Sequence, residues 1–374
     1  MLRRITALGL VGLGAHSTSA HAFDFDPSVF SFNGFGTVGA VYSSEEDAVF
    51  TGPGIKSRGA GHGDKISNDV DTRLGVQAIA KFTDELTATV QVISEEKNGH
   101  YAPHFEWANV RYAITPDFAI RVGRTAMPSY LFSDSRKVGY ALPWAREPHE
   151  AYNLLPITNS DGVDLTYKVH AGSVTNTIQA IYGENIVKLS GSIAKARDVW
   201  GIFNTVEVSD LSMKLSYQEF DLSMDLMGMT MPSAQVEFLA LGFHYDPGQW
   251  FAGAEWAQRD MHELGGKGNA WYATAGYRFG SVAPYVIVGE NNPDTEPFFN
   301  FTGFSTEQRS YTVGARWDFM RNFALKGEYQ YVDLPRNAQG LLSVPFDFTT
   351  FRPATAFTPG GEVHLLTLSL SFVF

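Results

Sequence analysis

Histidines are the residues of this chain best suited to acid–base or metal chemistry, because imidazole changes charge near neutral pH and binds metals. None stands in a known catalytic motif: there is no Gly-x-Ser-x-Gly, no His-Glu-x-x-His and no Walker-type loop. His100 and His104 are four apart, but Pro103 between them excludes a metal pair on one helix. Beyond the first 22 residues, which hold His16 and His21, the others are His62, His149, His170, His244, His262 and His364. We therefore expect no catalytic residue, no metal site, no cofactor and no enzyme.

The segment 127–161 combines charged and aromatic side chains. Its members of interest are Asp134, Arg136, Lys137, Trp144, Arg146, Glu147, Glu150 and Asp161. Such a mixture suits a loop folded against an inner wall, where carboxylates face basic residues across a water-filled gap. The alternative is an ordinary solvated loop. The first interpretation is favoured, since long loops in compact folds are usually functional.

Two acidic stretches and one apolar segment have less specific interpretations. Glu45-Glu46-Asp47 and the segment 291–296 could bind divalent cations that bridge lipopolysaccharide phosphates, but a solvated acidic surface is favoured. The segment 221–234 is rich in methionine and leucine: Met224, Leu226, Met227, Met229 and Met231. It could pack into a lumen, latch onto a neighbouring subunit or gate a hydrophobic substrate, and the first two interpretations are favoured together.

Strands must position these side chains, because strand-like runs recur along the whole chain. We expect strands near 30–43, 72–82, 85–95, 104–114, 117–126, 162–170, 173–184, 199–209, 211–220, 235–246, 249–259, 269–279, 281–290, 309–319, 322–333 and 363–374. Tight turns and longer segments alternate between them. The turns are Thr83-Asp84, Thr115-Pro116, Ala171-Gly172, Asp210, Pro247-Gly248, Gly280 and Met320-Arg321. The longer segments are 44–71, 96–103, 127–161, 185–198, 221–234, 260–268, 291–308 and 334–362.

This alternation predicts an all-β, transmembrane antiparallel β-barrel of about sixteen strands, with long outer loops and short periplasmic turns. Both termini then lie on the short-turn side, so the number of strands is even. Fourteen or eighteen strands stay open as alternatives if one long loop hides or lacks a hairpin. Sixteen strands enclose a space that wall side chains cannot fill. We therefore expect the third long loop, 127–161, to fold into the lumen.

The strands alternate between an apolar face and a polar face. In 72–82, one face holds Leu74, Val76, Ala78, Ala80 and Phe82, and the other holds Arg73, Gly75, Gln77 and Lys81, with Ile79 as the exception. The last run alternates in the same way, with Leu366, Leu368, Leu370, Phe372 and Phe374 together. The pattern predicts lipid outside and water inside.

The first residues have the features of a secretory signal peptide. Arg3 and Arg4 precede a short apolar run, and the small residues before Phe23 predict cleavage between Ala22 and Phe23. Domain organisation is then a signal peptide, 1–22, and a single barrel domain, 23–374. Cleavage removes two of 28 basic residues, which leaves 26 against 40 acidic ones and a net charge of −14.

Composition excludes several classes of protein. The chain has no cysteine, hence no disulfide framework and no thiolate metal site, and no later stretch approaches eighteen apolar residues, as a membrane helix would need. There is no basic stripe, which argues against nucleic-acid binding. Phenylalanine, tyrosine and tryptophan number 28, 16 and 7, as interfacial aromatic girdles require.

Three segments resemble the general Gram-negative porins, and the pattern of strands and loops resembles that family over the mature chain. Arg73-Leu74-Gly75-Val76 is similar to the family's second-strand segment, and residues 116–124 (PDFAIRVGR) are similar to the strand before its third loop. The closing strand ends in Phe372 and Phe374, which resemble the signal that the barrel assembly machinery reads. The chain lacks the family's Pro-Glu-Phe-Gly-like segment and has Ser160-Asp161-Gly162 where a further lumen arginine is usual. The resemblance is thus to a divergent branch.

The resemblance implies a trimer of sixteen-stranded barrels in the outer membrane, in contact with lipid and lipopolysaccharide. It implies a constriction with Arg73, Arg111, Arg121 and Arg124 on the wall. The loop side would hold Asp134, Arg136, Lys137, Arg146, Glu147, Glu150 and Asp161. Strict alternation along 118–124 puts Arg121 inside and Arg124 outside, and a bulge at Gly123 would reverse this.

We expect a porin through which small hydrophilic solutes and ions diffuse passively. Two alternatives stay open. One is a substrate-specific channel for an anion, a sugar or an aromatic acid, with Trp107, Trp144 and the arginines as a binding track. The other is a closed barrel that serves as an adhesin or anchor, which the polar inner faces argue against.

Overall fold

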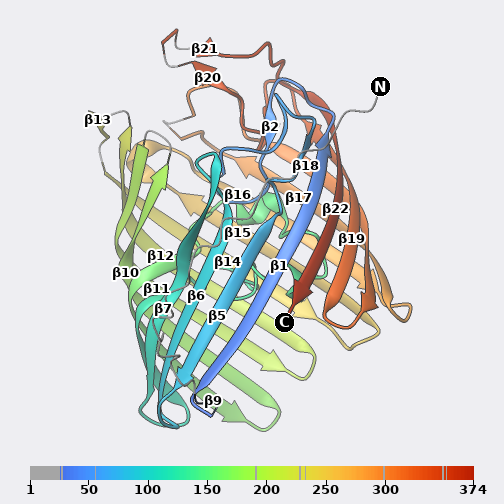
Figure 1. The fold of residues 1–374 in the computed structure, drawn as a ribbon. Helices are drawn as coiled ribbons and strands as arrows, with labels where there is room; N and C mark the ends of the chain where they lie inside the picture. The colour runs from blue at the N-terminus through green and yellow to red at the C-terminus, as the bar shows by residue number, and fades with distance from the viewer. Residues whose placement is uncertain are drawn as a thin grey trace, which may run out of the picture.

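The protein is a closed antiparallel β-barrel of sixteen long strands (Figure 1). The computed structural model describes residues 26, 28–54, 56–189, 192–226, 229–231, 233–297, 300–347, 349–350 and 352–374. The predicted signal peptide lies outside these residues and stays a prediction, as does the single mature domain. Sixteen is the expected number of strands, so the alternatives of fourteen and eighteen are excluded.

Each long strand pairs with its neighbours in chain order. The strands are β1 (Phe30–Ser43), β5 (Arg73–Lys81), β6 (Leu86–Lys97), β7 (His100–Ala113), β8 (Phe118–Ala126), β9 (Asn159–Ala171), β10 (Val174–Leu189), β11 (Ser192–Val208), β12 (Leu211–Leu226), β14 (Ala234–Tyr245), β15 (Trp250–Asp260), β16 (Gly268–Tyr277), β17 (Val282–Pro293), β18 (Gln308–Met320), β19 (Phe323–Leu334) and β22 (Gly361–Val373). β1 also pairs with β22, with Val38 opposite Leu370, and this pairing closes the ring.

Short elements lie in the connections. They are β2 (Val49–Phe50), β3 (Ala60–Gly61), β4 (Ile66–Ser67), the 3-10 helix η1 (Gly139–Ala141), α1 (His149–Tyr152), β13 (Met229–Thr230), the 3-10 helix η2 (His262–Leu264), β20 (Phe346–Asp347) and β21 (Arg352–Pro353). No helix among the described residues has the length and apolar character needed to cross a membrane.

The expected alternation of faces is confirmed in the strands where it was read. In β5, Leu74 and Val76 are exposed on the outer surface, whereas Arg73 is buried inside. In β22, Leu366 and Leu368 are exposed while Thr367 and Ser369 are buried. Exposed apolar side chains on the outside of a closed barrel are the surface that lipid tails cover.

Three of the segments expected to be long loops are mostly strand. Residues 96–103, 185–198 and 221–234 largely continue β6, β7, β10, β11, β12 and β14 as long hairpins. These predictions were wrong because the apolar alternation fades there, while backbone pairing continues without an apolar face. Register shifts at Gly183/Asn185 and Arg197/Trp200 mark where the alternation breaks.

Candidate functional site: the third loop inside the barrel

Residues 127–158, hereafter the third loop, leave the wall after β8 and reach the opposite side of the barrel. The green segment around α1 lies inside the ring of strands in Figure 1. Lys326 of β19 is fully buried and donates to three carbonyls of this loop, those of Gly139 (2.5 Å), Leu142 (2.8 Å) and Trp144 (2.6 Å). One ammonium group has three donors, so this lysine is saturated by the loop backbone. The contact fixes the middle of the loop on the far wall.

Arg146 provides the strongest charged contact of the third loop. Its Nε and Nη2 donate to the two carboxylate oxygens of Asp71 at 2.8 and 2.6 Å, and Nη2 also donates to Thr367 at 2.7 Å. Glu328 of β19 lies 3.6 Å from Nη1 and accepts the backbone N–H of Ala145. Burial alone would raise the pKa of Asp71, but Arg146 outweighs it, so the pKa of this carboxyl is lowered. The pair is ionised, bidentate and buried.

A second set of charges joins the third loop to β5, β6 and β7. We call Arg73, Glu95, Glu106 and Lys137 the charge cluster. Lys137 of the loop lies 2.6 Å from Glu95, and Arg73 donates to the carbonyl of Arg136 at 3.3 Å. His104 Nε2 lies 3.9 Å from Glu95 and 3.6 Å from Glu106. Among the residues that the structure describes, three buried atoms of this cluster have no hydrogen-bond partner: Arg73 Nε, Glu95 Oε2 and Glu106 Oε2.

The rest of the loop packs on apolar wall. The rings of Tyr130 and Tyr152 stack with centroids 4.3 Å apart, and Trp144 donates its indole N–H to Thr274 of β16 at 3.0 Å. The hydroxyl of Tyr152 donates to Glu255 of β15 at 2.6 Å. These side chains belong to a buried apolar cluster that also contains residues of β10, β11, β12, β14, β15, β16 and β17. Packing of these side chains therefore holds this side of the loop against the wall.

His149 is buried in the third loop. Its ring lies edge-on to Phe50 of β2, in the first loop (residues 44–72, between β1 and β5), with 5.3 Å between the ring centroids. Among the described residues, its Nδ1 has no hydrogen-bond partner. Burial lowers the pKa of His149 to about 3, and the neighbouring Arg146 adds to the effect. The imidazole is neutral at neutral pH and acts as a packing residue.

The predicted wall arginines take different positions. Arg73, Arg111 and Arg121 lie on the inner face, and Arg121 pairs with Asp164 at 2.8 Å. The register runs unbroken through Gly123, although its φ is +118°, and Arg124 faces Asp161 at 2.5 Å. Arg124 and Asp161 therefore share the outer face with the exposed Val122 and Val163.

The predicted loop residues pair mainly with each other and with the wall. Arg136 lies 3.1 Å from Glu147, and Glu150 accepts from Gln308 of β18 at 2.7 Å. Asp134 is exposed and acts electrostatically on Lys214 of β12. The expectation was loop carboxylates opposite wall arginines, but the strongest contacts join the loop cations Lys137 and Arg146 to carboxylates outside the loop.

Sequence reasoning missed the partners of those loop cations. For Lys137 and Arg146 these are Asp71, Glu95 and Glu328. Also missed were Glu106, which acts electrostatically with Lys137, Glu255, which accepts from Tyr152, and Lys326, which binds loop carbonyls. A signal was present for Lys326 and Glu328, because they are charged residues two apart in a strand whose other face carries Leu325 and Gly327. Within the described ranges, no group of three or more histidine, aspartate or glutamate side chains could hold a metal ion.

Comparison with known proteins identifies the family of this chain. A model of the Gram-negative porin family matches residues 6–337 of the 374. The chain belongs to this family. The solved outer-membrane channel DcaP of Acinetobacter baumannii is similar, with 12% identity, a TM-score of 0.57, and 93% of this chain and 99% of that chain covered. OmpF of Salmonella typhi, solved with daunomycin, has 15% identity, a TM-score of 0.56, and coverage of 92% and 97%.

A third similar structure is OmpT of Vibrio cholerae, with 12% identity, a TM-score of 0.55, and coverage of 94% and 99%. At such identities these structures show that the fold is shared. No curated protein matches the chain. As a Gram-negative porin with this barrel, the protein resides in the outer membrane.

Proposed function

We propose that this porin is a passive channel for small hydrophilic solutes and ions, with the third loop as its constriction and no covalent chemistry. The observation that carries the proposal is the charge cluster. Within the described part of the chain, buried Arg73 Nε, Glu95 Oε2 and Glu106 Oε2 have no hydrogen-bond partner, and buried polar atoms of this kind are normally satisfied by water. A hydrated gap between the loop and β5–β7 satisfies all three.

The path follows from the two sides of the third loop. Aromatic side chains of the loop pack against β14–β17, whereas the side facing β5–β7 presents charges. Below the charge cluster, the inner face continues with Arg111 and Arg121. We propose Arg73, Arg111, Arg121 and Lys137 as the cationic lining, with Glu95 and Glu106 opposing them. Arg124 and Asp161 are omitted because they share a face with lipid-exposed valines.

Assembly and partners are part of the proposal. One similar structure, the in-vitro folded OmpT of Vibrio cholerae, is described as a trimer form. We propose the same state here, with lipopolysaccharide around the barrel. Insertion would use the barrel assembly machinery, which reads Phe372 and Phe374. Phe374 already pairs by its backbone with Gly34 of β1 at 2.8 Å, so the closing strand ends at the seam of the ring.

The test is single-channel conductance of the refolded mature protein in a planar bilayer under a salt gradient. We expect stepwise openings in groups of three, and a reversal potential whose sign reports whether arginines or carboxylates dominate the gap. A folded, heat-modifiable barrel that never conducts would overturn the proposal and favour a closed barrel.

A further inference from the structure

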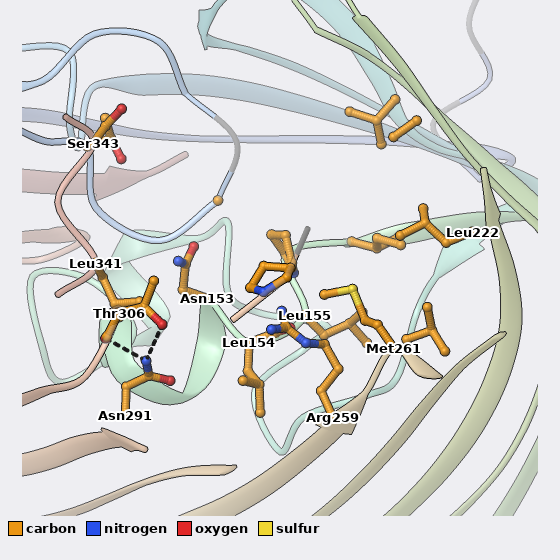
Figure 2. A pocket seen from close by; sticks show the side chains of 18 of the residues that line it. Asn153, Leu154, Leu155, Leu222, Arg259, Met261, Asn291, Thr306, Leu341 and Ser343 are labelled. Carbon is orange, nitrogen blue, oxygen red and sulfur yellow. Dashed lines mark hydrogen bonds between the residues drawn. The ribbon is translucent and has the colours of Figure 1, made fainter. Parts of the chain in front are cut away.

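A cavity of about 540 Å³ lies on the long-loop side of the third loop. Its floor is the end of that loop, from Asn153 to Ile157 (Figure 2). The walls come from the long hairpins β10–β11 and β12–β14 on one side and from the last two long loops on the other. Its volume falls within the range of small-molecule sites. A solute entering from the long-loop end meets this space before the third loop.

One side of the cavity is apolar. Its lining includes Leu154, Leu155, Leu222 and Met261 (Figure 2), together with Phe220 and Val236. Leu222 is only partly buried and packs on the same apolar cluster. An uncovered wall of this kind favours a ligand with an apolar body, because the ligand removes that surface from water.

The charges in the cavity have one sign. Arg259 of β15 reaches up into it (Figure 2). Lys56 also lines the cavity, but its ammonium group donates to the carbonyls of Asp69 and Val70, so Arg259 is the cation available to a ligand. No aspartate or glutamate occurs among the described residues that line it, although the full chain carries a net charge of −12. A positive cavity in an acidic protein selects for anions.

The guanidinium group of Arg259 is held in place by two hydrogen bonds and still has N–H donors available. Its Nη1 donates to the carbonyl of Leu154 at 3.0 Å and its Nε to that of Gly266 at 3.2 Å, so the guanidinium plane is fixed. No hydrogen bond from Nη2 is found within the described structure. Glu296 acts on Arg259 electrostatically, but its carboxylate accepts the N–H of Thr306 at 2.6 Å. Arg259 thus offers a carboxylate a preorganised donor.

A second polar group in the same cavity lacks a partner. Asn185 is buried, its Nδ2 donates to Asn159, and its Oδ1 accepts nothing. An unpaired buried acceptor costs stability unless water or a ligand donor reaches it. The cavity therefore combines an anion donor, a free acceptor and an apolar wall.

We propose that this cavity is a binding site for amphipathic organic anions, a carboxylate on an aromatic or aliphatic body, with Arg259 as the anchoring residue. Its role as a loading site for permeation rests on the proposed channel function, whereas binding itself does not. The apolar body lies against Leu222 and Met261, and the carboxylate takes the Nη2 donor of Arg259.

The test measures binding by calorimetry on the folded protein in lipid nanodiscs, with 4-phenylbutanoate as probe. Its neutral amide and butanoate are matched controls that remove the charge and the apolar body respectively. We expect each control to bind at least about tenfold more weakly, because a charge-assisted hydrogen bond and a buried ring are each worth that much. Equal binding of the amide would overturn the proposal.

Two variants locate the site. Arg259→Met should weaken 4-phenylbutanoate by about tenfold or more, while Arg309→Met, which removes an arginine on the outer face, should leave it unchanged. Because Arg259 also holds Leu154, a variant at Leu222 supplies an independent test. Leu222→Glu adds a carboxylate to the apolar wall and should weaken binding of the anion. Leu222→Gln, which adds no charge, should weaken binding less. Unchanged affinity in both Arg259→Met and Leu222→Glu would refute the site.

Parallel conductance records separate the two proposals. If the protein conducts salt but does not bind the probe, the channel function is supported and the binding site is refuted. If the protein binds the probe through Arg259 but never conducts, the binding site is supported and the channel function is refuted. Saturable block of current by 4-phenylbutanoate, absent in Arg259→Met, supports both.

Discussion

The third loop rests on two unlike surfaces. Towards β14–β17 it buries Tyr130, Trp144 and Tyr152 against apolar wall, with Glu255 satisfied by tyrosine hydroxyls. Towards β5–β7, β19 and β22 it places Arg136, Lys137 and Arg146 among carboxylates, and some buried atoms there stay unpaired. We call these the apolar bed and the charged bed.

The difference shows that one surface mainly fixes the position of the third loop, whereas the other also provides the path for permeation. Close packing of aromatic rings in the apolar bed holds the loop by contacts that ions do not disturb. Buried charges in the charged bed are costly unless paired or hydrated, so they specify where the loop lies and leave a polar path beside it. Variants in the two beds should therefore fail in different ways.

Loss of Arg146 should have the largest effect on stability. Arg146→Met leaves Asp71 and Glu328 buried without their cation, which costs about 3–5 kcal/mol for a broken buried pair. Urea unfolding of the barrel in lipid vesicles measures it. Arg309→Met breaks an exposed pair with Glu290 and should cost about 1 kcal/mol or less. Equal losses in the two variants would mean that the charged bed does not hold the loop.

The apolar bed should respond less to loss of one polar atom. Tyr152→Phe keeps the ring stack and removes only the hydroxyl that donates to Glu255, while Tyr272 and the N–H of Leu131 continue to donate to that carboxylate. We expect a loss of about 1–3 kcal/mol in the same assay. Tyr182→Phe, whose hydroxyl contacts Asp198 on the exposed outer face, is the control and should change little.

His149 makes stability depend on pH at the junction of the loops. Its pKa is about 3 in the folded chain and about 6.5 unfolded, so the unfolded chain binds more protons between these values. Its contribution is complete above pH 6.5 and is lost as the pH falls towards 3, by up to about 1.4 kcal/mol per pH unit. In His149→Phe, the free energy of unfolding should depend less on pH between 6.5 and 3 than in the parent protein. If the plots of this free energy against pH run parallel for the two proteins, His149 is not the residue responsible.

Within the charged bed, the pair Glu95–Lys137 should set ion selectivity. Glu95→Gln should shift the reversal potential towards anions and Lys137→Gln towards cations, each by roughly two- to fivefold in permeability ratio, since local charge controls a narrow pore. Arg309→Gln on the outer face should leave it unchanged. If neither Glu95→Gln nor Lys137→Gln moves the potential, solutes do not pass beside Glu95.

Most of the fold could be predicted, because lipid and water impose opposite faces on each strand. The alternation in 72–82 and at the closing strand was enough to orient β5 and β22. The long hairpins were missed, since strands beyond the bilayer need only backbone pairing. The partners of the loop charges were also missed. Asp71 and Arg146 are 75 residues apart, and no local pattern in the sequence reports a contact at that separation.

We propose that the third loop rests against the wall while the channel conducts, and a disulfide between the two can test this directly. The chain has no cysteine, and a Cβ built at Gly139 lies 3.6 Å from Cβ of Thr37 on β1, within the roughly 3.5–4.5 Å that a disulfide requires. The measurement is single-channel conductance of the Thr37→Cys/Gly139→Cys variant before and after reduction. We predict that the disulfide forms and that the oxidised channel conducts as well as the reduced one. A bond that does not form, or a current that appears only after reduction, would contradict the account.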